Sequence, residues 1–217
     1  MLEKMAAFFE ARLEGYDEHM LTAIESAETF YPFTASLLPK HPDVQILDLG
    51  CGTGLELEYY FRLQPSACVT GIDLSAGMLA ALKNKFPERS LQLVQGSYFD
   101  ILFPASAYDA AVSVESLHHF TKQQKLPLYQ KTFEALKADG IFVLTDYFAD
   151  TYEQENFFRS ELIRLKAESG INDHDFYHYD TPLTVKHETE TLLEAGFTRV
   201  SEVGAWGATH TLIAYKV

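Results

Sequence analysis

The chain has 217 residues, of which 47% are hydrophobic and 22% charged, a composition typical of one globular domain. Acidic residues outnumber basic ones by 31 to 17, for a net charge of −14, so nucleic acid is not expected as a partner. Two cysteines do not form a disulfide framework. The sequence has no apolar run of membrane-spanning length and no signal peptide pattern, so we expect a cytoplasmic protein without a membrane partner.

The first forty residues predict helices. Apolar side chains recur at helical spacing from Leu2 to Leu13, and a second helical stretch covers residues 18–30. Pro32 is expected to interrupt that stretch and to begin another short helix.

Strands and helices alternate from Val44 onward. Each expected strand is almost wholly apolar, which is typical of a parallel sheet covered by helices on both faces. We expect a three-layer α/β sandwich with strands at residues 44–49, 68–73, 91–96, 108–114 and 140–147, and helices at residues 53–63, 75–86 and 122–137.

The alternation ends after Tyr147. A helix is expected over residues 152–169, followed by a loop rich in aromatic and histidine residues, and residues 148–184 are predicted to form an inserted lid. After a helix at 185–195, two strand-like segments are separated by a tight turn at Trp206 and Gly207, which favours an antiparallel hairpin. The predicted sheet therefore has seven strands, mostly parallel, with an antiparallel C-terminal strand.

A glycine-rich turn follows the first of the alternating strands. Gly50, Gly52 and Gly54 precede a helix, so backbone N–H groups and a positive helix end face any ligand there. The dinucleotide-binding pattern G-x-G-x-x-G requires a glycine where Leu55 stands. This mismatch counts against an NAD-linked enzyme.

Acidic residues surround the same turn. Asp73 ends the second strand, where a carboxylate accepts both hydroxyls of a ribose, as it does for NAD and for other adenosine ligands. Asp48 precedes the glycines and Glu115 ends the fourth strand. These carboxylates favour a sulfonium amino-acid cofactor over a pyrophosphate.

Several segments resemble, in order and spacing, the motifs of class I S-adenosylmethionine-dependent methyltransferases. They are ILDLGCGTG (46–54), TGIDLSAGML (70–79), LVQGSYFD (93–100), YDAAVSVESLHHF (108–120), LKADGIFVLTDY (136–147) and LLEAGFTRV (192–200). The resemblance covers residues 44–217. It implies a Rossmann-like fold in a single methyltransferase domain over residues 1–217, with S-adenosylmethionine as cofactor and S-adenosylhomocysteine as product.

The resemblance also implies a set of cofactor contacts. Asp48, Gly50, Cys51 and Gly52 would border the methionine part, Asp73 would bind the ribose, and Glu115 would lie near the methyl group. The adenine would lie against Leu74, Met78, Gly96, Ser97 and Tyr98. Ser97 departs from the family pattern, which often has an aspartate there for the adenine amino group. Tyr16, in GYDEHM, resembles a segment that folds over the sulfonium, so residues 1–40 are expected to form a helical cap over the cofactor.

The family fixes no catalytic residue. His118, His119 and His19 are candidates for removing a proton from the acceptor, although simple packing explains each of them as well. His174, His178 and His187, with nearby aspartates, match no compact ligand set, so no metal site is predicted.

The sequence therefore predicts methyl transfer from S-adenosylmethionine to a small molecule by in-line displacement. The alternatives are methylation of an RNA base or a protein, an NAD-linked oxidoreductase, and a module that binds S-adenosylmethionine without catalysis. The acceptor is not identified, and a homodimer is left open.

Overall fold

The computed structural model describes residues 2–171 and 175–217, and its centre is one seven-stranded sheet in the order β3-β2-β1-β4-β5-β7-β6. Neighbouring strands pair in parallel from β3 to β5, whereas β7 runs antiparallel to both β5 and β6. This topology confirms the prediction. The strands are β1 (Gln45–Leu49), β2 (Cys68–Asp73), β3 (Ser90–Gln95), β4 (Tyr108–Val114), β5 (Leu136–Tyr147), β6 (Arg199–Trp206) and β7 (Thr209–Tyr215).

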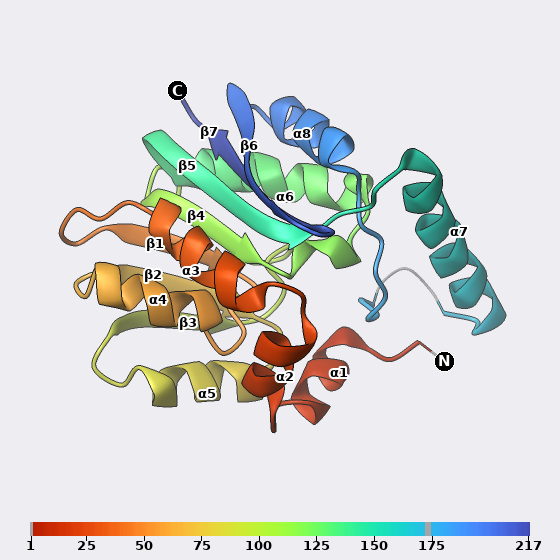
Figure 1. Cartoon of the computed structure of the whole chain (residues 1–217), viewed down its shortest axis with the longest axis horizontal. Coiled ribbons are helices and arrows are strands. Elements are labelled where there is room, and N and C mark those ends of the chain that lie inside the picture. Colours follow the sequence, from red (N-terminus) through yellow and green to blue (C-terminus); the bar gives the residue numbers. More distant parts are fainter. Residues whose placement is uncertain (1, 172–174) are drawn as a thin grey trace.

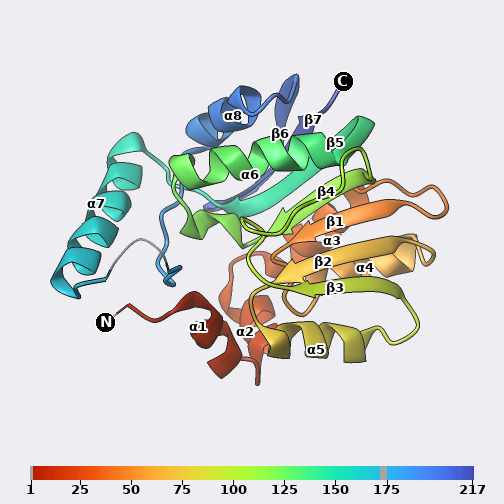
Figure 2. The same ribbon diagram turned by 180° about the vertical axis from the view of Figure 1, so that it is seen from behind.

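Helices cover both faces of the sheet, as expected for three layers. α3 (Ala27–Leu37) and α4 (Leu55–Leu63) lie in front of the sheet in Figure 1. α6 (Lys122–Ala135) and α8 (Val185–Glu194) lie in front of it in the reverse view of Figure 2. Each face has its own apolar cluster, one around Tyr60 and the other around Phe142. α5 (Ala76–Lys85) packs against β2 and β3.

Two short helices and one long helix lie outside these layers. α1 (Met5–Ala11) and α2 (Tyr16–Ala23) lie side by side at one end of the sheet in both views. α7 (Tyr152–Glu168) stands beside the sheet, and none of its described residues is fully buried. No helix within residues 2–171 and 175–217 is both long and apolar enough to cross a bilayer.

The boundary predicted at Pro32 is wrong. The helix expected over residues 18–30 divides earlier, because α2 ends at Ala23 and Ser26 has a positive φ of 62°. Pro32 lies inside α3, where it forfeits the one hydrogen bond that its missing N–H would donate. Buried Phe30 and Tyr31 anchor the helix at this point, so tertiary packing outweighs the local preference of proline.

We expect the buried ion pair between α6 and α8 to contribute strongly to stability. Lys125 Nζ lies 2.6 Å from Glu188 Oε2, and both side chains are almost wholly inaccessible. Glu188→Gln leaves a buried ammonium group without a countercharge, which should lower the free energy of unfolding by about 3–5 kcal/mol in urea titrations. The matched control is Glu194→Gln, because the Lys122–Glu194 pair joins the same helices at 3.0 Å but is exposed. The control should lose less than about 1 kcal/mol, and an equally small loss in Glu188→Gln would contradict this account.

Candidate functional site

The turn after β1 requires glycine for two reasons. Gly50, Gly52 and Gly54 all have positive φ, at 78°, 47° and 73°. A Cβ at Gly50 would lie 2.1 Å from the Ser116 hydroxyl, which is far inside contact distance. The Gly50 N–H donates to the Ile72 carbonyl at 2.9 Å, so the turn is fixed to the end of β2.

Asp73 joins this turn to the start of α5. Its Oδ2 accepts from the Gly52 N–H at 3.0 Å, and its Oδ1 accepts from the Ser75 N–H at 2.8 Å. Burial raises the pKa of this carboxyl, although the backbone donors oppose the shift. Asp73 therefore holds the glycine turn and the start of α5 together through hydrogen bonds.

A narrow cavity of about 40 Å³ opens above the glycine turn. It collects predicted cofactor residues from four separate parts of the sequence, namely Tyr16, Gly50, Gly52, Asp73, Met78 and Glu115. It also contains His119, which was predicted as a catalytic candidate, and four residues that the sequence analysis did not select, namely Met5, Phe9, Val114 and Ser116. The two α1 residues, Met5 and Phe9, resemble ordinary core positions of an amphipathic helix, and nothing in their spacing marks them as site residues.

The other predicted cofactor residues do not line this cavity. Asp48 and Cys51 are buried. The Ser97 hydroxyl accepts from the Phe99 N–H at 3.1 Å, and the Tyr98 hydroxyl lies 3.2 Å from that of Ser116. Leu74 and Gly96 are half-buried next to these elements.

Asp48 forms a buried acidic pair with Glu56 of α4. Burial raises the pKa of both carboxyls, and the charge of Glu56 raises that of Asp48 further. Within the described residues, Asp48 Oδ2 and Glu56 Oε1 have no hydrogen-bond partner. Buried carboxylates of this kind attract a cation and repel a pyrophosphate. Sequence reasoning missed Glu56, because an acidic residue in the first turn of a helix is explained by the helix dipole.

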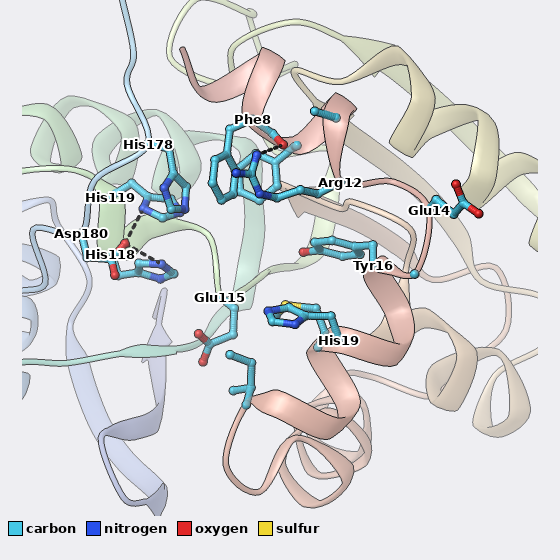
Figure 3. A pocket seen from close by; sticks show the side chains of 15 residues that line it. Phe8, Arg12, Glu14, Tyr16, His19, Glu115, His118, His119, His178 and Asp180 are labelled. Carbon is cyan, nitrogen blue, oxygen red and sulfur yellow. Dashed lines mark hydrogen bonds and ion pairs between the residues drawn. The ribbon is translucent and has the colours of Figure 1, made fainter. Parts of the chain in front are cut away.

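A second cavity, of about 610 Å³, adjoins the first (Figure 3). Tyr16 and His19 enter it from α2, and Glu115 enters it from the end of β4. His118 and His119 of the 3₁₀ helix η1 (Leu117–His119) face them from the other side. The remaining lining includes Phe8 and Phe9 of α1, Arg12 directly after α1, and His178 and Asp180 of the loop before α8. All three predicted catalytic candidates therefore line one cavity.

The two cavities meet along a common border. Phe9, Tyr16, Glu115 and His119 line both of them. A ligand in the narrow cavity would touch a ligand in the wide one at this border. The arrangement suits transfer of a small group between two bound molecules.

The two neighbouring histidines differ in the pKa of their imidazole groups. His118 Nδ1 lies 2.5 Å from Asp146 Oδ1, and although burial opposes protonation, Asp146 raises the pKa of His118 to about 9. Burial instead lowers the pKa of His119 to about 4. Near pH 7, His118 is a cation and His119 is neutral. Burial also raises the pKa of Glu115 to about 7.

Side chains of α1 and α2 fasten these helices over the narrow cavity. The Ser75 hydroxyl and the Gly77 N–H donate to Glu10 Oε2 at 2.5 and 3.1 Å. Asp17 accepts from the Thr53 hydroxyl and from Lys85 Nζ, the latter at 2.6 Å. Tyr16 is thereby held between the glycine turn and the wide cavity.

The histidines considered for a metal in the sequence lie in different places. His174 and Asp173 lie outside the described residues. His187 pairs with Glu155 of α7 at 2.9 Å, and Asp175 pairs with Lys4 at 2.9 Å. His178 and Asp180 line the wide cavity.

Comparison with known proteins agrees with the fold and with the glycine turn. A family model described as a methyltransferase domain matches residues 46–140, which contain the turn, Asp73 and Glu115. This match, the named relatives and the solved structures support a class I S-adenosylmethionine-dependent methyltransferase. S-adenosylmethionine is the cofactor of this family.

Known proteins align with different parts of this chain. It is 25% identical over 198 residues to carboxy-S-adenosyl-L-methionine synthase of Campylobacter concisus, covering 84% of this chain and 80% of the relative. It is 46% identical over 63 residues to the uncharacterized phycocyanin operon protein W of Pseudanabaena tenuis, covering 29% of this chain and 58% of that protein. The solved structure of human N-acetylserotonin methyltransferase with S-adenosylmethionine shares the fold, with a TM-score of 0.60 at 17% identity, covering 96% of this chain and 55% of the human chain.

The acidic pair predicts an unusual pH dependence of stability. Because the folded pKa values of Asp48 and Glu56 lie above their unfolded values, the folded protein retains protons that the unfolded chain releases, and the free energy of unfolding falls as pH rises above about 4. Glu56→Gln should reduce the fall in Tm between about pH 5 and 8, measured by scanning calorimetry. Glu58→Gln on the same helix removes an exposed carboxylate paired with Arg62 and serves as the control. An unchanged fall in Glu56→Gln would contradict the buried pair.

Proposed function

We propose that this methyltransferase passes the methyl group of S-adenosylmethionine to a small-molecule acceptor held in the wide cavity. The border formed by Phe9, Tyr16, Glu115 and His119 carries the proposal, because it joins the narrow cavity on the glycine turn to a separate, wide cavity. The chamber volume of about 610 Å³ lies in the range of small-molecule sites, roughly 300–1,000 Å³. The net charge of −14 supports a small acceptor over RNA.

The electrostatics of the narrow cavity support a cationic cofactor. Asp73 offers carboxylate oxygens with lone pairs beyond those that accept the Gly52 and Ser75 N–H groups, so it also accepts ribose hydroxyls. Asp48 of β1 and Glu56 of α4 form a buried acidic pair on the two sides of the turn in the chain. The ammonium and sulfonium charges of S-adenosylmethionine would favour the ionised forms of these carboxyls, whereas the pyrophosphate of NAD would oppose them.

The reaction we propose is a single displacement. The acceptor atom attacks the methyl carbon, the carbon–sulfur bond breaks, and its electron pair passes to sulfur, leaving S-adenosylhomocysteine. Tyr16 presents an aromatic ring at the border, where it would contact the positive sulfur. The protein contributes orientation and the exclusion of water. His118 is not the proton acceptor, because it already carries a proton through Asp146.

We propose that residues 148–184 form a lid over the wide cavity. We also propose that residues 1–40 form a cap over the cofactor and that this cap moves when the cofactor binds. The narrow cavity, at about 40 Å³, is far below the roughly 300 Å³ of a small-molecule site. Met5 and Phe9 of α1 occupy part of its wall. Release of Glu10 from Ser75 and Gly77 would free α1 and admit the nucleoside.

The name of the Campylobacter relative suggests a second product, a carboxylated form of S-adenosylmethionine. An added carboxylate at the transferred carbon would lie near Glu115 at the border of the cavities. Among the described lining residues, Arg12 is the one arginine or lysine, and it pairs with Glu3 at 3.3 Å. This charge distribution favours methyl transfer over carboxylation.

Asp73→Asn should weaken binding of S-adenosylhomocysteine by about 10- to 100-fold in titration calorimetry, because hydrogen bonds to a charged acceptor contribute about 1.5–3 kcal/mol. NAD should not bind either protein. The control is Asp109→Asn, which removes a carboxylate that accepts from Gln45 at the start of β1 and from Lys137. Equal affinity in the Asp73 variant, or binding of NAD alone, would refute the cofactor assignment.

The acceptor class is tested by following a labelled methyl group. Protein incubated with S-adenosylmethionine carrying a radioactive methyl should transfer the label to a low-molecular-weight cell extract. Parallel incubations with transfer RNA and with a protein pool should remain unlabelled. Label confined to either macromolecule would overturn the small-molecule proposal, and a carboxylated cofactor in the mass spectrum would replace methyl transfer as the activity.

A further inference from the structure

Three side chains converge on one wall of the wide cavity (Figure 3). His119 Nδ1 lies 3.0 Å from Asp180 Oδ1, and His118 Nε2 lies 3.6 Å from the same oxygen. The potential ligand atoms of the three residues all lie within 4.8 Å of one another. Tetrahedral bonds of about 2.0–2.1 Å to nitrogen and oxygen separate neighbouring ligand atoms by about 3.3 Å. The two distances to Asp180, 3.0 and 3.6 Å, lie on either side of this value, so the three side chains could hold one ion.

The two histidine nitrogens that face Asp180 are available as ligands. His119 Nδ1 is buried and makes no hydrogen bond within the described residues. The other nitrogen of His118, Nδ1, is bound to Asp146 at 2.5 Å, so Nε2 is the atom directed at Asp180. A metal ion that binds Nε2 displaces the proton that this atom carries in the metal-free protein. A carboxylate that orients the far nitrogen of a ligand histidine is typical of protein metal sites.

A competing grouping of Glu115, His118 and Asp146 is less suitable. Those residues also place ligand atoms within 4.8 Å of one another. However, Asp146 also accepts from the Leu117 N–H at 2.8 Å and the Tyr147 N–H at 2.9 Å, so its oxygens are already occupied. Asp146 therefore positions His118 and leaves metal binding to the other group.

The loop that carries Asp180 is tied down on both sides of that residue. The Thr181 N–H donates to the His118 carbonyl at 2.7 Å, which fixes the loop to η1. The His178 N–H donates to the Glu3 carbonyl at 2.9 Å. The position of the Asp180 carboxylate thus follows from backbone contacts as well as from its histidine neighbours.

We propose that His118, His119 and Asp180 bind one divalent transition metal, whose open coordination positions face the wide cavity and hold an oxygen atom of the acceptor. Two imidazoles and one carboxylate suit Zn²⁺, Fe²⁺ or Co²⁺ better than Mg²⁺ or Ca²⁺. Three protein ligands leave at least one position open, as in catalytic sites. The claim that these residues bind a metal follows from this geometry alone. The claim that the metal holds an acceptor oxygen rests on the proposed methyl transfer.

The proposed metal would explain how a hydroxyl acceptor loses its proton in a site where both histidines serve as metal ligands. A divalent cation lowers the pKa of an oxygen acid that it holds. The proton passes to solvent, and the oxygen electron pair forms the new bond to the methyl carbon. The electrons of the broken carbon–sulfur bond remain on sulfur, so the products are a methyl ether or ester, S-adenosylhomocysteine and one proton.

Metal binding is tested with Co²⁺ and the tag-free, chelator-treated protein. Titration should produce visible absorption bands that saturate at one Co²⁺ per chain and are displaced by Zn²⁺ but not by Mg²⁺. His119→Gln and Asp180→Asn should abolish the bands, and Asp146→Asn should weaken Co²⁺ binding about 10- to 100-fold. The matched control is His187→Gln, because the His187–Glu155 pair has similar chemistry outside the cavity. Bands that are absent, or that survive in both ligand variants, would overturn the proposal.

Two further readouts separate the parts of the proposal. Calorimetry with S-adenosylhomocysteine checks that each variant still binds cofactor, so loss of Co²⁺ binding is not mistaken for unfolding. Acetohydroxamate, which offers two oxygen atoms, should shift the Co²⁺ bands because the open positions face the cavity. An unchanged spectrum would refute the acceptor part. Neither readout depends on methyl transfer, so a failed activity assay and a failed metal site are distinguishable.

Discussion

The hydrogen bonds of Asp73 are the contact on which the rest of the site depends. One carboxylate holds the Gly52 N–H after β1 and the Ser75 N–H at the start of α5, so two backbone segments meet at one acidic group. Ser75 in turn donates its hydroxyl to Glu10, which brings α1 over the same place. The glycine turn, α1 and the Asp73 carboxylate thus form one connected unit.

Charge is distributed unevenly around this unit. Asp48 of β1 and Glu56 of α4 are buried, and burial raises the pKa of both carboxyls. The wide cavity instead contains a neutralised pair, because Asp146 stabilises the positive charge of His118. In the proposed function, a cationic donor binds beside these acidic groups and favours their ionised forms, and the imidazole nitrogen atoms face the acceptor. This difference would give the two cavities distinct ligands although they share a border.

The sequence predicted the sheet and its antiparallel strand, and it identified six residues that line the narrow cavity, because those features depend on local signals. Apolar strands, the glycines at Gly50 and Gly52, and an acidic residue at a strand end are visible in the chain itself. The acceptor side was not predictable in the same way. Asp180 lies far along the chain from His118 and His119, and a hydrogen bond from the Thr181 N–H to the His118 carbonyl brings them together. Similarly, the sequence predicted a helix break at Pro32, but α3 continues through this residue because Phe30 and Tyr31 are buried.

The central claim is that donor and acceptor meet where the two cavities join. A crystal structure of the complex with S-adenosylhomocysteine tests it most directly. We expect the ribose on Asp73, the homocysteine on the glycine turn, and the sulfur at the border between Tyr16 and Glu115, facing the 610 Å³ cavity. A cofactor whose sulfur points away from that border, or whose nucleoside fills the wide cavity, would contradict the account.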